Sequence, residues 1–170
     1  MIMDEIFTRR LRLKSIDRLD KEDLIEILKD EVVNKTYMVP PLNNKQDEDD
    51  LFNRYYRLNS LDDYFVYGIY FEGKLIGVIH SVNIKDKEIE LGYFINRLFH
   101  NKGFASEAVR AVISHLLESG YEVIKAGAFS ENLASMKVME KCGMKRIEEV
   151  EEITYRCQKH LCFYYEIRKE

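Results

Sequence analysis

One short stretch of the chain combines residue types that can hold an anion. It reads HNKGFASEA, residues 100–108. Gly103 lets the backbone bend and approach a ligand closely, and Ala105 adds little bulk. Ser106 and Lys102 can add a hydroxyl donor and a positive charge, while a strand-to-helix turn exposes backbone N–H groups at the positive end of the helix dipole. The stretch predicts a loop that binds a phosphate or diphosphate, which we call the cradle. An ordinary strand-to-helix turn without a ligand explains Gly103 and Ala105 equally well.

The surrounding residues predict the elements that position this stretch. A β-rich run over residues 87–96 precedes it, and apolar residues at helical spacing follow it until Gly120. Residues 121–129 then read as a strand and 131–142 as a short helix. Strand, helix, strand and helix in this order imply a parallel crossover, so we expect an α/β fold with a mixed sheet.

The first half of the chain and its end predict further elements. They are a strand at 9–14, a helix at 20–33, a break at Pro40 and Pro41, a helix at 47–59, a hairpin at 64–84 and a last strand at 161–167.

Composition limits the class of protein. The chain has 170 residues, of which 46% are hydrophobic and 33% charged, so we expect one globular domain over 1–170, as a monomer or homodimer. No apolar run is long enough to span a membrane, and the three cysteines suit a reducing compartment, which favours the cytoplasm. The net charge is −4, and acidic and basic residues are interleaved along the chain rather than grouped in blocks. This distribution argues against direct nucleic-acid binding and mildly favours cationic substrates.

Two segments together resemble a known family. ELGYFINRLFHNKGFASEA, followed about 25 residues later by NLASMKVMEKCGM, is similar to the two cofactor motifs of GNAT N-acetyltransferases. Within that superfamily the chain resembles the RimJ/RimL branch, whose members acetylate protein N-termini or small amines, because RRLRLK and NKTYMVPPLNN also match. One departure is His100, where the family's phosphate loop usually begins with Gln or Arg. Since the loop binds mainly through backbone N–H groups, we expect this change to weaken binding rather than abolish it.

The resemblance implies acetyl-CoA as co-substrate and no metal. It implies a mostly antiparallel sheet flanked by helices, with a splay between two parallel central strands. The pantetheine arm is expected along the backbone of Tyr93, Phe94 and Ile95, with Asn132 bonding to it. The diphosphate is expected on the loop that follows His100, namely Asn101, Lys102, Gly103, Phe104, Ala105 and Ser106.

Proton transfer needs a base and a stabiliser for the leaving thiolate. Glu90 matches the glutamate of the family's ELGY segment, so we expect it to act as a base through water; the alternative is a solvated charge or an ion-pair partner. A backbone N–H near Tyr93 is expected to polarise the thioester carbonyl. Many GNAT members carry a tyrosine acid where this chain has Met139. Ser135 is therefore the candidate thiolate stabiliser, unless it only bonds its own backbone.

The acceptor is expected to be a primary amine. By resemblance, Tyr37, Met38 and Tyr55 border its pocket, although the same aromatic residues can simply pack two helices on the sheet. A protein N-terminal amine is the first candidate, a polyamine or aminoglycoside the second, and a noncatalytic acyl-CoA sensor remains open. Cys157, His160 and Cys162 lack the fourth ligand that a structural zinc site needs, and His80 reads as a structural residue.

Overall fold

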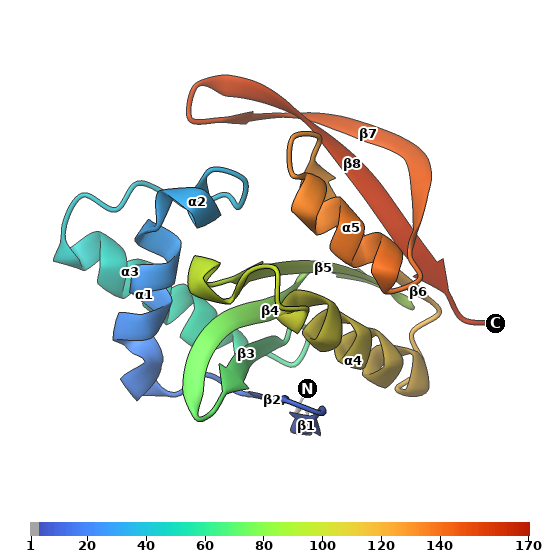
Figure 1. Cartoon of the computed structure of the whole chain (residues 1–170), viewed down its shortest axis with the longest axis horizontal. Helices are drawn as coiled ribbons and strands as arrows, with labels where there is room; N and C mark the ends of the chain where they lie inside the picture. Colours follow the sequence, from blue (N-terminus) through green and yellow to red (C-terminus); the bar gives the residue numbers. More distant parts are fainter. Residues whose placement is uncertain (1–3) are drawn as a thin grey trace.

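The computed structural model describes residues 4–170 and consists of one eight-stranded sheet with helices on both faces (Figure 1). The strand order is β1-β2-β3-β4-β5-β6-β8-β7. Its strands are β1 (Ile6–Phe7), β2 (Leu11–Lys14), β3 (Val66–Phe71), β4 (Lys74–Lys85), β5 (Glu88–Ile95), β6 (Val123–Phe129), β7 (Lys145–Tyr155) and β8 (Gln158–Arg168).

The helices divide between the two faces of the sheet. They are α1 (Lys21–Lys29), α2 (Glu31–Asn34), α3 (Lys45–Leu58), α4 (Phe104–Glu118) and α5 (Leu133–Lys141), with short 3₁₀ turns at Arg18–Asp20 and Arg97–Phe99. One core cluster joins α4 and Met139 of α5 to the sheet, and a second joins α1 and α3 to the opposite side of β3, β4 and β5. The apolar periodicity of these helices explains this burial.

The central strands separate partway along their length. Within the described residues, β5 and β6 are the one parallel pair, and their pairing ends at Leu91 opposite Ala126. β5 continues to Ile95 and β6 to Phe129, so the two strands splay apart beyond that point. The expected mixed, mostly antiparallel sheet with a splay between parallel central strands is confirmed. Ligands of open α/β sheets bind at such carboxyl ends of parallel strands.

Two predicted elements differ from the structure. The helix expected at 20–33 is two helices, because the backbone of Asp30 is extended and its side chain accepts a hydrogen bond from the Val32 N–H. β7 was not predicted, since its sequence KRIEEVEEITY is almost entirely exposed and shows no apolar alternation. It forms an edge strand that pairs with β8 alone among the described strands.

The β7–β8 hairpin reaches across the molecule. Figure 1 shows it arching over α5 with its tip directed toward α2. The Tyr155 hydroxyl donates a hydrogen bond of 2.6 Å to the carbonyl of Asn34, and the Arg156 Nη1 donates to the Asn34 side chain at 2.9 Å. The hairpin thereby joins the C-terminal half of the sheet to the end of α2. No helix among residues 4–170 has the length and apolar character needed to span a bilayer.

Candidate active site

A cleft of about 410 Å³ opens between the splayed end of β5, the start of α4 and α5. Ten of the twelve residues expected to bind the cofactor line it; they are Tyr93, Phe94, Ile95, His100, Asn101, Gly103, Phe104, Ala105, Ser106 and Ser135. Lys137 and Lys141 of α5 also line it. We call this hollow the β5–α4 cleft. Its lining brings backbone N–H groups and two ammonium groups to one place, which suits a polyanionic ligand.

The loop before α4 has the conformation that an anion cradle needs. Gly103 has a φ of 78°, in the left-handed region that glycine adopts without strain, and Asn101 has a φ of 59°. α4 begins at Phe104, so the N–H groups of its first turn have no acceptor within the helix. The bend at Gly103 and the open first turn leave backbone N–H groups available to an anion.

One ring nitrogen of His100 is engaged by the end of β5. Its Nε2 lies 2.7 Å from the carbonyl oxygen of Ile95, and because a carbonyl can only accept, Nε2 must carry the donated hydrogen. The side chain therefore ties the loop to the end of β5. This arrangement gives the histidine a structural role that the sequence could not reveal.

A second cleft, of about 440 Å³, lies on the other side of the splay. We call it the splay cleft. Glu90, Tyr37 and Met38 line it, together with His80, Phe129, Glu151 and Tyr164. Tyr93 and Ser135 line both clefts, so the two hollows meet at these residues. A ligand in the β5–α4 cleft and a second ligand in the splay cleft would touch there.

Gly92 makes room for a histidine at the floor of the splay cleft. A Cβ atom at Gly92 would lie 2.9 Å from both Cε1 and Nε2 of His80, closer than real contacts allow. Gly92 directly follows the last residue of β5 that pairs with β6. The absent side chain therefore lets the His80 ring lie against the backbone where the strands separate.

Hydrogen bonds fix the tautomer of His80. Its Nδ1 lies 3.1 Å from the Ser81 carbonyl and must donate, while burial lowers the pKa of the ring and keeps it neutral. Nε2 therefore accepts, and the Tyr37 hydroxyl 2.7 Å away donates to it. The Tyr55 hydroxyl, 2.6 Å from that of Tyr37, then donates to Tyr37. Tyr55 does not line the splay cleft but orients a residue that does.

Glu90 lies in an environment that favours its neutral form. Burial raises its pKa most, Lys125 opposes this, and the carboxylates of Glu149 and Glu151 add to the increase. Lys125 pairs with Glu90 in the β5–β6 register, and its ammonium group forms an ion pair with Glu149. A carboxyl group with a raised pKa is better matched to proton transfer near neutral pH than an ordinary glutamate.

Ser135 is held from two sides. Its backbone N–H donates at 3.1 Å to the side chain of Asn132, which caps α5, and its Oγ lies 2.7 Å from the Tyr93 hydroxyl. Asn132 thus acts as the helix cap and does not line the β5–α4 cleft. Met139, which stands where many GNAT members carry a tyrosine, is fully buried in the core. Tyr93 brings a phenol to this region from a different element.

Arg10 is a residue near the site that sequence reasoning missed. Its guanidinium bonds Glu107 and the carbonyl of Lys102, so it contacts the cradle from outside the cleft. No signal in a single sequence pairs residues 97 positions apart. Lys102, expected to contact phosphate, does not line the cleft; its ammonium lies 5.6 Å from the centre of the Phe99 ring.

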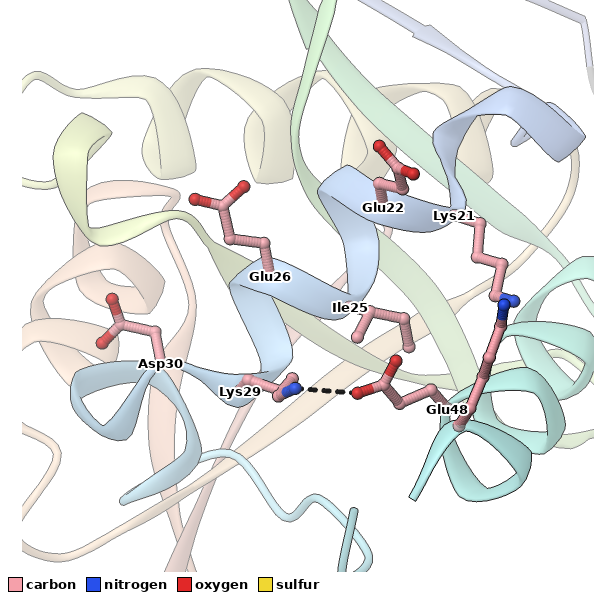
Figure 2. Close-up of a pocket in the computed structure, with 8 residues that line it drawn as sticks. Lys21, Glu22, Ile25, Glu26, Lys29, Asp30 and Glu48 are labelled. Carbon is pink, nitrogen blue, oxygen red and sulfur yellow. Dashed lines mark hydrogen bonds and ion pairs between the residues drawn. The ribbon is translucent and has the colours of Figure 1, made fainter. Parts of the chain in front are cut away.

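Another hollow, of about 570 Å³, shares no lining residue with these clefts. It lies between α1 and α3, and Figure 2 shows Lys29 and Glu48 joined by an ion pair across it. Its walls are mostly charged side chains. Within residues 4–170, no group of three or more His, Cys, Asp or Glu side chains is arranged to hold a metal ion.

The fold recurs in known proteins. A crystal structure of a GNAT-family acetyltransferase from Bacillus anthracis superposes with a TM-score of 0.83 at 26% identity, covering 97% of this chain and 98% of that one. An acetyltransferase from Salmonella typhimurium, described as modifying the N-terminal serine of ribosomal protein L7/L12, gives a TM-score of 0.81 at 16% identity over 96% of this chain and 97% of that one. The second likeness shows the shared fold alone.

Sequence comparison defines the family. The acetyltransferase (GNAT) domain model matches residues 10–145, so the chain belongs to this family. The probable N-acetyltransferase YjcK of Bacillus subtilis is 32% identical over 91 residues, which is 50% of each chain, so this chain matches half the length of that relative. Since GNAT acetyltransferases use acetyl-CoA, the domain is an acetyl-CoA-dependent acetyltransferase domain, and the finer RimJ/RimL assignment remains a proposal.

Proposed function

We propose that the protein transfers an acetyl group from acetyl-CoA to a primary amine by direct attack in a ternary complex. The observation that carries this proposal is the meeting of the two clefts at Tyr93 and Ser135. The β5–α4 cleft is the candidate cofactor site and the splay cleft the candidate acceptor site. Two substrates bound in these clefts would bring their reacting atoms together without a covalent enzyme intermediate.

The cofactor assignment rests on the cradle and the open strand edge. Backbone N–H groups of residues 101–106 and the ammonium groups of Lys137 and Lys141 suit the phosphates. Beyond Leu91, no strand among residues 4–170 pairs with β5 on its β6 side, so its backbone is available to the amide groups of pantetheine. An N–H near Tyr93 is the candidate donor to the thioester oxygen as negative charge develops there.

Glu90 is the proposed base and Ser135 the proposed thiolate stabiliser. Glu90 removes one proton from the incoming ammonium through a water molecule, because its carboxylate lines the acceptor side and its pKa is raised toward neutrality. The amine then forms the C–N bond, and the C–S bond breaks. Ser135 donates a hydrogen bond to the departing sulfur. The nitrogen then loses one of its two remaining protons to the thiolate and keeps the other in the amide; a reference pKa of about 8.5 makes the thiol a tolerable leaving group.

An α-amine of a protein or peptide N-terminus is the proposed acceptor, as in the RimJ/RimL branch. An α-amino group has a reference pKa near 8 and lysine one near 10.4, so deprotonating lysine costs about 3 kcal/mol more. Glu90 is a weak base and therefore suits the α-amino group better than lysine. Polyamines and aminoglycosides are the second candidate class, because Glu90 and Glu151 both line the splay cleft and favour a cationic acceptor. The alternative to an enzyme is a noncatalytic protein that binds acyl-CoA as a signal.

Paired peptides test this assignment. One peptide of each pair has a free N-terminus and no lysine; the other has a blocked N-terminus and one lysine. Mass spectrometry after incubation with acetyl-CoA is expected to show acetyl only on the free N-terminus. Acetylation of the lysine peptide alone, or of polyamines but no peptide, would contradict the N-terminal assignment while leaving the acetyltransferase proposal intact.

A further inference from the structure

Arg10 reaches the candidate diphosphate cradle from the opposite end of the chain. It lies in the turn between β1 and β2, and its Nη1 donates a 2.9 Å hydrogen bond to the carbonyl of Lys102. Its Nε donates at 2.7 Å to Glu107 Oε2, and its backbone N–H donates at 2.8 Å to Glu107 Oε1. Lys102 precedes the bend at Gly103 and Glu107 follows it, so one side chain spans the bend.

Arg10 also packs on the residues between those two contacts. Its guanidinium carbon lies 4.3 Å from the centre of the Phe104 ring. A Cβ atom at Gly103 would lie 3.3 Å from Arg10 Nη2. Arg10 thus contacts both the start of α4 and the back of the loop. Arg10 does not line the β5–α4 cleft, so its recorded contacts are with the loop itself.

Glu107 is fixed independently of Arg10. The Thr8 hydroxyl donates to Glu107 Oε1 at 2.6 Å and accepts from the Leu11 N–H at 2.9 Å. Burial acts to raise the pKa of Glu107, but the hydrogen bonds from Thr8 and Arg10 outweigh it and lower the pKa overall. Glu107 therefore stays ionised and remains a strong acceptor for the guanidinium at neutral pH.

The loop needs such support because its conformation is uncommon. Asn101 and Gly103 both have positive φ, and a non-glycine residue in that region carries a local energetic cost. A loop that already has its binding conformation loses less conformational freedom when a diphosphate binds. The affinity of such a loop for the diphosphate is therefore higher. A planar guanidinium with donors in a fixed fork can hold two acceptors at once, which lysine cannot do in the same geometry.

We infer that Arg10, anchored on Glu107, is a positioning residue that preforms the diphosphate cradle through the carbonyl of Lys102. This inference rests on the proposed function, because it takes the cradle to bind the diphosphate of acetyl-CoA. Through the loop, Arg10 affects only the binding of the diphosphate part of the cofactor. It has no contact with the splay cleft, where the acceptor is expected.

A truncated cofactor separates this role from general stability. Acetyl-pantetheine carries the thioester and the pantetheine arm but no diphosphate. Steady-state rates with a shared acceptor amine give KM and kcat for acetyl-CoA and for acetyl-pantetheine. Arg10→Ala is expected to raise KM for acetyl-CoA about tenfold, as the loss of charge-assisted hydrogen bonds implies. It should leave kcat and the KM for acetyl-pantetheine within about twofold.

Arg12 supplies a matched control. It lies two residues away, and its guanidinium also pairs with a glutamate, Glu5, at 2.7 Å, yet it contacts no residue of the cradle. Arg12→Ala should leave both KM values unchanged. Arg10→Lys and Glu107→Gln each keep part of the network and are expected to raise KM for acetyl-CoA by a smaller factor than Arg10→Ala, and they provide the test if Arg10→Ala fails to fold.

The outcomes decide between this inference and its alternatives. Equal losses with acetyl-CoA and acetyl-pantetheine, no loss with acetyl-CoA, or the same loss in Arg12→Ala would overturn the role of Arg10. Failure of the wild-type protein to bind CoA at all would instead overturn the proposed cofactor site. The two failures are distinguished by isothermal titration of the wild-type protein with CoA.

Discussion

The Tyr93 hydroxyl lies 2.7 Å from Ser135 Oγ and 3.2 Å from the Ser135 carbonyl oxygen. This pair joins β5 to the first turn of α5 at the place where the two clefts meet. Burial raises the pKa of Tyr93, so its phenol remains a hydrogen-bond donor throughout the physiological range. The pair can therefore hold a serine hydroxyl toward the sulfur of a bound thioester.

Removing this hydroxyl pair should slow the chemical step. We expect Ser135→Ala to lower kcat about tenfold to hundredfold, because a donor to the developing thiolate is lost, while Kd for CoA changes little. Tyr93→Phe should have an effect in the same direction. Since the two residues act as one unit, the double variant should be no worse than Ser135→Ala by more than a small factor. Stopped-flow thiol release measures this; full additivity would contradict the coupling.

Glu90→Gln should remove the base and its pH dependence. The pKa of Glu90 is raised, mainly by burial, so the active carboxylate forms at a higher pH than it would for an ordinary glutamate. kcat/KM should rise with pH as this carboxylate forms in the wild type but not in the variant. We expect a loss of about 100-fold at neutral pH. Glu88→Gln, an exposed change on the same strand, is the control, and equal losses in both would contradict the assignment.

A charge at the bend of the cradle should weaken cofactor binding. Gly103→Asp brings bulk and negative charge to a residue with a φ of 78°, and Gly73→Asp makes the same change at a φ of 81° in the β3–β4 turn. We expect at least about a tenfold increase in Kd for CoA only in the first variant. Calorimetric titration measures both, and unaltered affinity in Gly103→Asp would exclude the cradle as the phosphate site.

His80 should make the fold less stable in acid. Its folded-state pKa is lowered by burial, so below the unfolded-state value of about 6.5 the unfolded chain binds more protons than the folded chain. Stability should therefore rise with pH between the lowered pKa and about 6.5 and then level off. Denaturant unfolding of His80→Gln should lack this component, whereas His115→Gln should retain it. The same pH dependence in His80→Gln and the wild type would refute the account.

Much of the fold follows from local pattern. Helical periodicity predicts α3 and α4, and Glu72-Gly73 predicts the β3–β4 turn, because these signals depend on neighbouring residues. β7 escaped prediction because its side chains are exposed, so its pairing with β8 leaves no alternation in the sequence. The break at Asp30 depends on one capping side chain that an otherwise continuous helical pattern obscures.

The residues of the candidate site also differ in how far a single sequence can group them. The sequence could group the proposed cradle residues because they are contiguous, and ten of the twelve residues expected to bind the cofactor line one cleft. The Tyr37–His80 hydrogen bond and the Arg10–Glu107 contact join residues 43 and 97 positions apart, and no single-sequence pattern reports such contacts. His80 was interpreted as structural; it is satisfied by hydrogen bonds and also lines the splay cleft.

The most direct measurement is CoA thiol release from acetyl-CoA over a panel of N-terminal peptides, polyamines and aminoglycosides. The proposed function predicts turnover with at least one primary amine, led by the peptides, and a loss of that turnover in Glu90→Gln and Ser135→Ala. Tight binding of acetyl-CoA with no thiol release from any amine in the panel would contradict the enzyme proposal and favour an acyl-CoA sensor.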